Sequence, residues 1–333
     1  MSANATDDRP TLMVWGALGI VYVVWGSTYL GIKIAIETMP PMLHGSLRFV
    51  TAALLLAGFL VIRKGLAPFR MSLRQFGGAA LVGLLLLTGG NGMVAVAEQH
   101  ISSGLAALLV ASVPLWLVVF RFAVRDRPAL LTLAGVLVGF CGVAALSLGG
   151  GASGGTTGIV VILVASLSWS IGSFLSARIP MPSSVWAASA IEMLAGGMGL
   201  AVVGTSFGER LDLAAVSGRS WLALAYLVLV GSLVGFTAYT WLLGNARISL
   251  VSTYAYVNPV VAVLLGVLVV NEHITAQILL GGLVILIGVA LVVSTERRAK
   301  PVAPVAAEIT APTEAAAPAE AAAPVPAEDS ASR

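Results

Sequence analysis

Charged residues are scarce in this sequence, and their scarcity sets its class. Asp, Glu, Lys and Arg make up 10% of the 333 residues, whereas a soluble domain carries about 25%. Hydrophobic residues make up 58%, which is too large a share for a surface that faces water. The formal net charge is only +3, too small to favour nucleic-acid binding. Most of the chain is therefore predicted to lie in lipid.

Cysteine and histidine are scarce as well. Cys141 is the one cysteine, so an internal disulfide and a cysteine-rich metal site are excluded, and we interpret it as a small buried hydrophobe. The histidines, His44, His100 and His273, all lie at ends of apolar runs. No Ser–His pair, HExxH motif or paired acidic motif lies deep in those runs, and the sequence has no nucleotide-binding loop. An intramembrane enzyme is therefore disfavoured, and no metal or cofactor is expected.

Ten apolar runs are each long enough to cross a bilayer, which takes roughly 20 residues. They cover residues 13–34, 42–62, 76–97, 102–122, 130–149, 158–177, 184–204, 221–243, 249–270 and 274–294. The N-terminal segment before them is polar and carries two acids rather than a basic stretch, so the first run is interpreted as a permanent span and not as a signal peptide. The sequence thus predicts an all-α integral membrane protein with ten transmembrane helices.

Lysine and arginine gather on one side of this predicted topology. The loops and ends on that side carry Arg9, Arg63, Lys64, Arg70, Arg74, Arg121, Arg125, Arg127, Arg178, Arg247, Arg297, Arg298 and Lys300. The opposite loops hold only Arg210 and Arg219. Because basic loops stay in the cytoplasm, both termini are predicted to be cytoplasmic. The tail at 296–333 alternates Ala, Pro and Glu, lacks an apolar face and is predicted to be disordered.

The ten spans divide into two similar halves. HISSGLAALLVASVPLW at 100–116 matches NARISLVSTYAYVNPVV at 245–261, and this match places Pro114 on Pro259. Five spans per half invert the second copy, an arrangement typical of carriers that expose a central site to each side in turn. A duplication kept only for packing is the alternative. The expected domains are an N-terminal segment at 1–11, a first repeat at 12–149, a Gly-rich periplasmic linker at 150–157 and a second repeat at 158–295.

Several segments resemble the drug/metabolite transporter superfamily, in particular its paired EamA domains and their YedA-like branch. The segments are WGSTYLGIKIAIETMPPMLHGSLRFVTAALLL (25–56), GGNGMVAVAEQHISSGLAALLVASVPLW (89–116), SLSWSIGSFLSARI (166–179), AIEMLAGG (190–197) and STYAYVNPVVAVLLG (252–266). The likeness implies ten helices in two inverted repeats and a multi-pass carrier in the cell inner membrane. Members are similar to exporters of amino acids and other small metabolites, but the likeness does not fix the cargo.

Polar and aromatic residues recur at spacings of three and four, which places them on single faces of several spans. The predicted substrate-binding residues are Tyr22, Trp25, Tyr29, Asn91, Trp169, Ser170, Ser173, Tyr239, Tyr254 and Asn258. In a cavity wall, rings contact the apolar part of a small amphipathic solute and hydroxyls bind its polar part. The alternatives are an interfacial belt for Trp and Tyr and close helix packing for Ser.

The helical hydrogen bonding is expected to be interrupted in spans three, four and nine. The stretch GGNG places Gly89, Gly90 and Gly92 in span three, where each glycine weakens a helix by roughly 1 kcal/mol relative to alanine. Pro114 and Pro259 lack the N–H group that a helix interior uses. Irregular backbone at depth is tolerated where it is packed in protein or lines a wet cavity. These residues are predicted hinges beside the solute, with glycine-mediated packing as the alternative.

Few charged residues lie inside the spans. Arg48 and Glu192 occupy matching places in spans two and seven, where an ionisable group is a functional candidate. Glu192 is the candidate proton carrier. The alternative gives both residues a structural role, including contact with each other. Lys33 is expected to snorkel towards the membrane surface, and Glu98 and Glu272, at span ends, are expected to be solvated.

These patterns favour a secondary transporter that moves amino acids or related amphipathic solutes by alternating access. Export is expected from the resemblance alone. An uptake carrier or a passive channel for a small solute is the alternative, although a channel would favour a continuous polar stripe. The expected partners are a small-molecule substrate, the lipid bilayer and a coupling proton, with facilitated diffusion as the alternative to coupling. The chain is expected to be a monomer or a homodimer.

Overall fold

Four helices begin directly after a serine whose side chain caps the free N–H groups of the first turn. In the computed structural model, Ser72 Oγ accepts a hydrogen bond from Gln75 N at 3.3 Å, and Gln75 Oε1 accepts one from Ser72 N at 2.9 Å. Ser102, Ser184 and Ser217 accept the equivalent bond from the third residue of their helices. The capped helices are α3 (Leu73–Gly83), α5 (Ser103–Val110), α9 (Val185–Ser206) and α10 (Gly218–Tyr226).

The structure describes residues 12–125, 128–148, 156–246, 251 and 253–296. The first half also contains α1 (Leu12–Ala35), α2 (Pro41–Lys64), η1 (Ala67–Phe69), η2 (Leu84–Gly92), α4 (Met93–Ala97), α6 (Val113–Ala123) and α7 (Leu130–Leu148). The second half also contains α8 (Thr156–Ser176), η3 (Leu227–Val234), α11 (Gly235–Asn245), α13 (Tyr254–Val270) and α14 (Ala276–Glu296). The predicted N-terminal segment and nearly all of the predicted linker and tail lie outside the described residues.

The prediction of an all-helical membrane fold is confirmed. Within the described ranges, 9 helical segments are long and apolar enough to cross a membrane, and α13 is a shorter apolar helix of 17 residues. Span four is divided between α5 and α6, and span eight is divided between α10, η3 and α11. The predicted ninth span began at 249, but α13 begins at Tyr254, and most of the preceding residues lie outside the described part.

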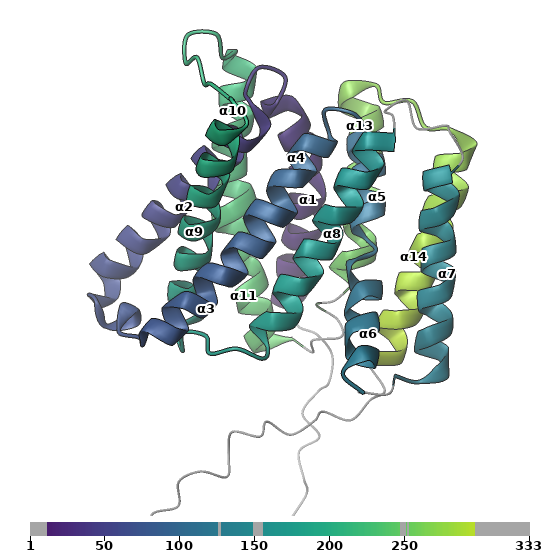
Figure 1. Ribbon diagram of the computed structural model, residues 1–333, viewed down its shortest axis with the longest axis horizontal. Coiled ribbons are helices and arrows are strands. Elements are labelled where there is room, and N and C mark those ends of the chain that lie inside the picture. Colours follow the sequence, from purple (N-terminus) through teal and green to yellow (C-terminus); the bar gives the residue numbers. More distant parts are fainter. Residues whose placement is uncertain (1–11, 126–127, 149–155, 247–250, 252, 297–333) are drawn as a thin grey trace, which may run out of the picture. The chain divides into compact units, whose positions relative to one another are not determined.

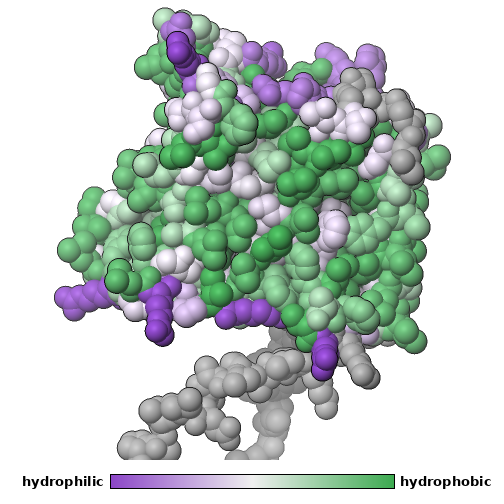
Figure 2. All heavy atoms as spheres, in the orientation of Figure 1, coloured by the Kyte–Doolittle hydropathy of each residue, from purple (hydrophilic) through white to green (hydrophobic). Residues whose placement is uncertain are grey.

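The surface matches a lipid environment. Many large apolar side chains are exposed on the helices, among them Ile62, Leu222 and Leu268. Figure 2 shows apolar residues across the middle of the visible face and hydrophilic residues at its two ends. A band of exposed apolar side chains on this scale is covered by acyl chains in a membrane protein.

The first helix of each half packs on helices of the other half. The first helix of the first half, α1, packs on α13 and α11 of the second half. The first helix of the second half, α8, packs in return on η2, α4 and α6 of the first half. The pairs α2 with α9 and α7 with α14 join equivalent helices, and Figure 1 shows α7 beside α14. This reciprocity is the contact pattern expected of two inverted repeats.

Glycine at position 83 lets the backbones of α3 and α9 come into direct contact. A Cβ atom added at Gly83 would lie 2.2 Å from the carbonyl oxygen of Glu192. Small residues bring membrane helices together in this way, because lipid tails give two apolar helix faces no hydrophobic reason to associate.

Candidate functional site

Both halves contain a π-helical segment at the equivalent place, η2 in span three and η3 in span eight. A π-helix widens the turn and changes the main-chain hydrogen bonds, and such segments are frequent at functional sites. Side-chain hydroxyls bind carbonyls there: Ser168 Oγ of α8 donates to Leu85 O at 2.8 Å. In η3, Ser232 Oγ donates to Leu227 O at 2.9 Å. Irregular backbone therefore lies at depth in both halves and is held by hydroxyls.

Arg48 of α2 joins these two segments. Its Nε donates to Ser232 Oγ of η3 at 3.1 Å, and its Nη1 lies 3.4 Å from Asn91 Oδ1 of η2. The guanidinium also lies 4.7 Å from the centre of the Phe49 ring. Arg48 is only 5% exposed. Each of these contacts is with a neutral group, and no acidic side chain in the described ranges forms an ion pair with it. Arg48 is thus a buried cation at the meeting point of the two halves.

Three predicted aromatic residues from different helices form a cluster. The ring centres of Trp25 and Tyr239 are 5.0 Å apart, those of Trp25 and Tyr254 are 5.2 Å apart, and those of the two tyrosines are 5.8 Å apart. These edge and tilted contacts are the favourable geometries for aromatic pairs. The hydroxyls of Tyr22 and Thr253 hydrogen-bond beside this cluster. The cluster joins α1 of the first half to α11 and α13 of the second.

Asn258 connects α13 to α1. It is 9% exposed, and with its amide oriented so that the nitrogen faces carbonyls, it donates to Tyr22 O and Tyr254 O, both at 3.3 Å. The neighbouring Pro259 lies inside α13, which continues through it. Asn258 thus uses its donors on backbone carbonyls in this conformation, and this accounts for a polar residue next to proline in an apolar span.

The predicted residues of α8 lie against the first half and not in the aromatic cluster. Trp169 packs on η2, where a Cβ at Gly90 would lie 2.9 Å from its ring. Ser170 Oγ donates to Ser166 O at 2.6 Å and to Val113 O at 3.3 Å. Val113 and Pro114 form the first turn of α6, just after the break in span four. Ser170 therefore supports that break.

The other predicted site residues have these places. Ser173 is half-buried on α8, and Tyr29 on α1 lies within electrostatic range of Tyr254 and Glu98. The predicted hinge residues Gly89 and Gly92 are packed tightly: added Cβ atoms would lie 2.2 Å from Ser168 Oγ and from Leu200 Cδ2, respectively. The glycines of η2 therefore serve packing here, and their role as hinges stays a prediction.

Glu192 does not pair with Arg48. It is half-buried on α9, and its side chain makes no hydrogen bond or ion pair with any other described residue. Its backbone lies against Gly83 of α3. The partners of Arg48 come from η2 and η3, whereas Glu192 lies against α3. These two residues, at equivalent positions of the two repeats, therefore have different surroundings.

At the end of the bundle where α1 stops, two charged side chains hold the loop between α4 and α5. Lys33 donates to the carbonyl oxygens of Glu98 and, at 3.1 Å, of Ile101. The carboxylate of Glu272 accepts from Ser103 N at 2.7 Å and from Gly104 N at 3.2 Å. A cation thus lies on the carbonyl end of α4 and an anion on the N–H end of α5, as the helix dipoles favour.

The expectation that Glu98 is solvated is wrong, and Glu272, for which the same was expected, is half-buried. Glu98 is 0% exposed and Glu272 caps α5. Position at a span end predicted hydration, but helices from both halves cover this loop, and a single span does not reveal such tertiary contacts. The stretch EQHISSG at 98–104 carries a sequence signal that a new helix begins here, because Ser102 is a typical N-cap residue and lies four residues after Glu98.

We expect Glu272→Ala to destabilise the protein by about 1–2 kcal/mol, because two N–H groups of α5 lose a charged acceptor. Glu37→Ala is the matched control, since Glu37 lies at the same end in an exposed pair with Arg219 at 3.7 Å. Its expected effect is close to zero. Thermal unfolding in detergent measures both variants, and equal melting temperatures would contradict the capping role.

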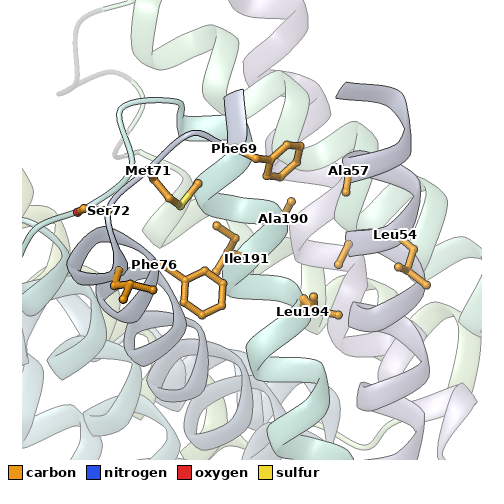
Figure 3. A pocket seen from close by; sticks show the side chains of 11 residues that line it. Leu54, Ala57, Phe69, Met71, Ser72, Phe76, Ala190, Ile191 and Leu194 are labelled. Atoms are coloured by element: carbon orange, nitrogen blue, oxygen red, sulfur yellow. The ribbon is translucent and has the colours of Figure 1, made fainter. Parts of the chain in front are cut away.

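A separate apolar groove of about 430 Å³ lies between α2, α3 and α9. Phe69, Phe76, Ile191 and Leu194 are among its lining residues (Figure 3). Its lining includes no residue of α1, α11 or α13, so it is distinct from the aromatic cluster. Exposed Leu54 and Leu73 at its rim place it on the lipid-facing side.

Two interlocked helical halves, each with a broken helix at depth, define a polytopic membrane protein built from a repeated unit. One solved crystal structure has this fold, with a TM-score of 0.59 and 20% identity over 85% of this chain and 98% of that chain. The chain belongs to the EamA-like transporter family, whose model matches residues 13–148 and 156–294. It is therefore a membrane transporter of the drug/metabolite transporter superfamily.

Relatives of the chain are named as transporters. YedA of Escherichia coli K12, an uncharacterized inner membrane transporter, is 44% identical over 262 residues, or 78% of this chain and 83% of that protein. The uncharacterized transporter YoaV of Bacillus subtilis is 27% identical over 298 residues, covering 86% of this chain and 100% of YoaV. These relatives and the apolar helices support a multi-pass inner-membrane protein with a small-molecule substrate.

Proposed function

We propose that this transporter is a secondary carrier that exports small amphipathic metabolites carrying a carboxylate, such as amino acids, by alternating access. One observation carries the proposal: Arg48 is a buried cation between the broken helices of the two halves, and its partners Ser232 and Asn91 are neutral. A buried charge is costly unless an opposite charge accompanies it. The carboxylate of a cargo supplies that charge, and the rings of the nearby cluster suit its apolar part.

The repeats support the mechanism. Because Arg48 contacts both π-helical segments, rocking one half against the other changes its partners and exposes it to one side at a time. In this proposal both termini are cytoplasmic, the repeats are the segments 12–149 and 158–295, and the Lys33 end faces the periplasm. Export as the direction rests on the resemblance to exporters of the drug/metabolite transporter superfamily.

A passive channel is the second candidate function, and uptake is the reverse direction of the same carrier. The polar contacts of Arg48 and Asn258 favour the carrier over a channel, because both side chains bind neighbouring helices in this conformation. An intramembrane enzyme is the remaining alternative; within the described residues no group of three or more His, Cys, Asp or Glu could hold a metal ion.

The test begins with a metabolite-resistance screen in an over-expressing strain, which identifies a cargo, and continues with flux in liposomes. We expect Trp25→Ala to weaken cargo binding about three- to tenfold, because it removes two aromatic contacts. Trp15→Ala is the matched control on the same helix, since Trp15 is 51% exposed on the lipid side. If both variants transport every cargo as the wild type does, the cluster does not bind cargo.

A further inference from the structure

The carboxyl group of Glu98 has no partner, although it is completely buried. Glu98 follows directly after α4, is 0% exposed, and neither carboxylate oxygen hydrogen-bonds to another described residue. An ionised carboxylate in such a place costs several kcal/mol even after relaxation. A buried acid avoids this cost by binding a proton.

The charged neighbours of Glu98 are occupied elsewhere. Lys33 directs its ammonium group at the main-chain carbonyls of Glu98 and Ile101, and no ion pair links it to the Glu98 carboxylate. The carboxylate of Glu272 is taken by the N–H groups of Ser103 and Gly104. The polar groups of this corner therefore support the backbone and leave the Glu98 carboxyl free.

The helices packed on this corner bring few charged or titratable groups to Glu98. From α1 come Lys33 and Tyr29, and Glu272 comes from the turn after α13. Helices α5 and α8 carry no ionisable side chain. On α2, Arg63 and Lys64 lie in the last turn, at the opposite end, and the first half of that helix carries His44 and Arg48, of which Arg48 is engaged by η2 and η3. Burial, and to a smaller extent Glu272, raises the pKa of Glu98 well above the usual carboxyl value, while Lys33 opposes the shift.

We propose that Glu98 is a proton-binding site of the transport cycle, protonated while it is buried and deprotonated when this end of the bundle opens to water. The proposal rests on the alternating-access function proposed above. On opening, the carboxyl O–H bond breaks and the proton passes to water, which leaves a hydrated carboxylate beside Lys33. On closing, a proton from the same side returns to the carboxylate. A proton that leaves and returns on one side is not carried across the membrane, so Glu98 would make the opening of this end depend on the pH of that side.

The closed arrangement is expected to depend on pH in one direction. Because burial raises the pKa of Glu98, the stability of the closed form is fully present at a pH below the ordinary carboxyl range. It is lost as the pH rises through the raised value. Alkaline conditions on this side therefore favour the open form.

The test is infrared spectroscopy of the full chain in liposomes across a pH titration. We expect the wild type to show the band of a protonated carboxyl that disappears only above the ordinary carboxyl range. Glu98→Gln should lack that component, while Glu37→Gln, an exposed acid at the same end, should retain it. Spectra that titrate alike in the wild type and Glu98→Gln would overturn the proposal.

A second measurement covers the case in which Glu98→Gln folds poorly. The melting temperature of the wild type should fall as the pH rises through the same range, and Glu98→Asp should shift that range. A wild-type melting temperature that stays level there would also overturn the proposal. Neither measurement needs a cargo, so the proton site can fail while the carrier function stands.

Discussion

Arg48→Lys is expected to lower cargo flux about 10- to 100-fold, because a single ammonium group does not reach both π-helical segments and bind a carboxylate in the forked geometry of a guanidinium. The present contacts at 3.1 Å and 3.4 Å come from different nitrogens of the same side chain. Flux of whichever cargo the wild type moves, measured in liposomes at equal protein content, gives the ratio directly.

Arg63→Lys is the control for the loss of a guanidinium from α2. Arg63 is exposed in the last turn of that helix, so its replacement is expected to leave flux unchanged. Wild-type flux in Arg48→Lys would show that Arg48 only stabilises helix contacts, which is the structural alternative that the sequence left open.

Gly83→Ala is expected to destabilise the fold by about 3 kcal/mol, because its methyl group overlaps the backbone of α9 and the helices must separate. The carbonyl oxygen of Glu192 would lie 2.2 Å from the new atom. Backbone does not move aside as a flexible side chain does, so the strain spreads over the whole contact between α3 and α9. The measurement is the midpoint of unfolding in detergent.

Gly77→Ala tests the same chemical change on the same helix without the contact. A Cβ at Gly77 meets no atom within 4 Å, so the substitution is expected to be neutral or to stabilise by up to about 1 kcal/mol through helix propensity. Equal unfolding midpoints for the two variants would mean that the backbones of α3 and α9 are not in direct contact at Gly83.

The fold class followed from simple patterns because lipid imposes simple requirements. Apolar runs of the right length, and the match of Pro114 to Pro259, predicted the helices and the repeat. The π-helical turns of η2 and η3 were not predicted, because apolar composition is the same in α- and π-helices. GGNG indicated irregular backbone in span three, whereas span eight has no comparable stretch.

The candidate site was predictable only in part, since one helix face does not show what lies opposite. Helical spacing placed Tyr22 and Trp25 on one face of α1, and the structure brings Tyr239 and Tyr254 to them. The same reasoning grouped Trp169 and Ser170 of α8 with the aromatic cluster. In the structure Trp169 packs on η2, and Ser170 binds the carbonyl of Val113 at the start of α6. Glu98 was misjudged because its burial comes from the packing of both halves over a loop, which sequence position alone does not encode.

Accessibility of the region beside Arg48 from the two faces of the membrane tests the central claim most directly. Thr28 and the Arg48 guanidinium lie 3.2 Å and 3.5 Å from where a Cβ on Gly231 would stand, so Thr28→Cys in a Cys141→Ala background places one thiol in this region. A membrane-impermeant thiol reagent is applied to right-side-out and to inside-out vesicles. Alternating access predicts that this thiol reacts from each face in turn as the cargo gradient is reversed. Reaction from one face only, whatever the gradient, would contradict the account.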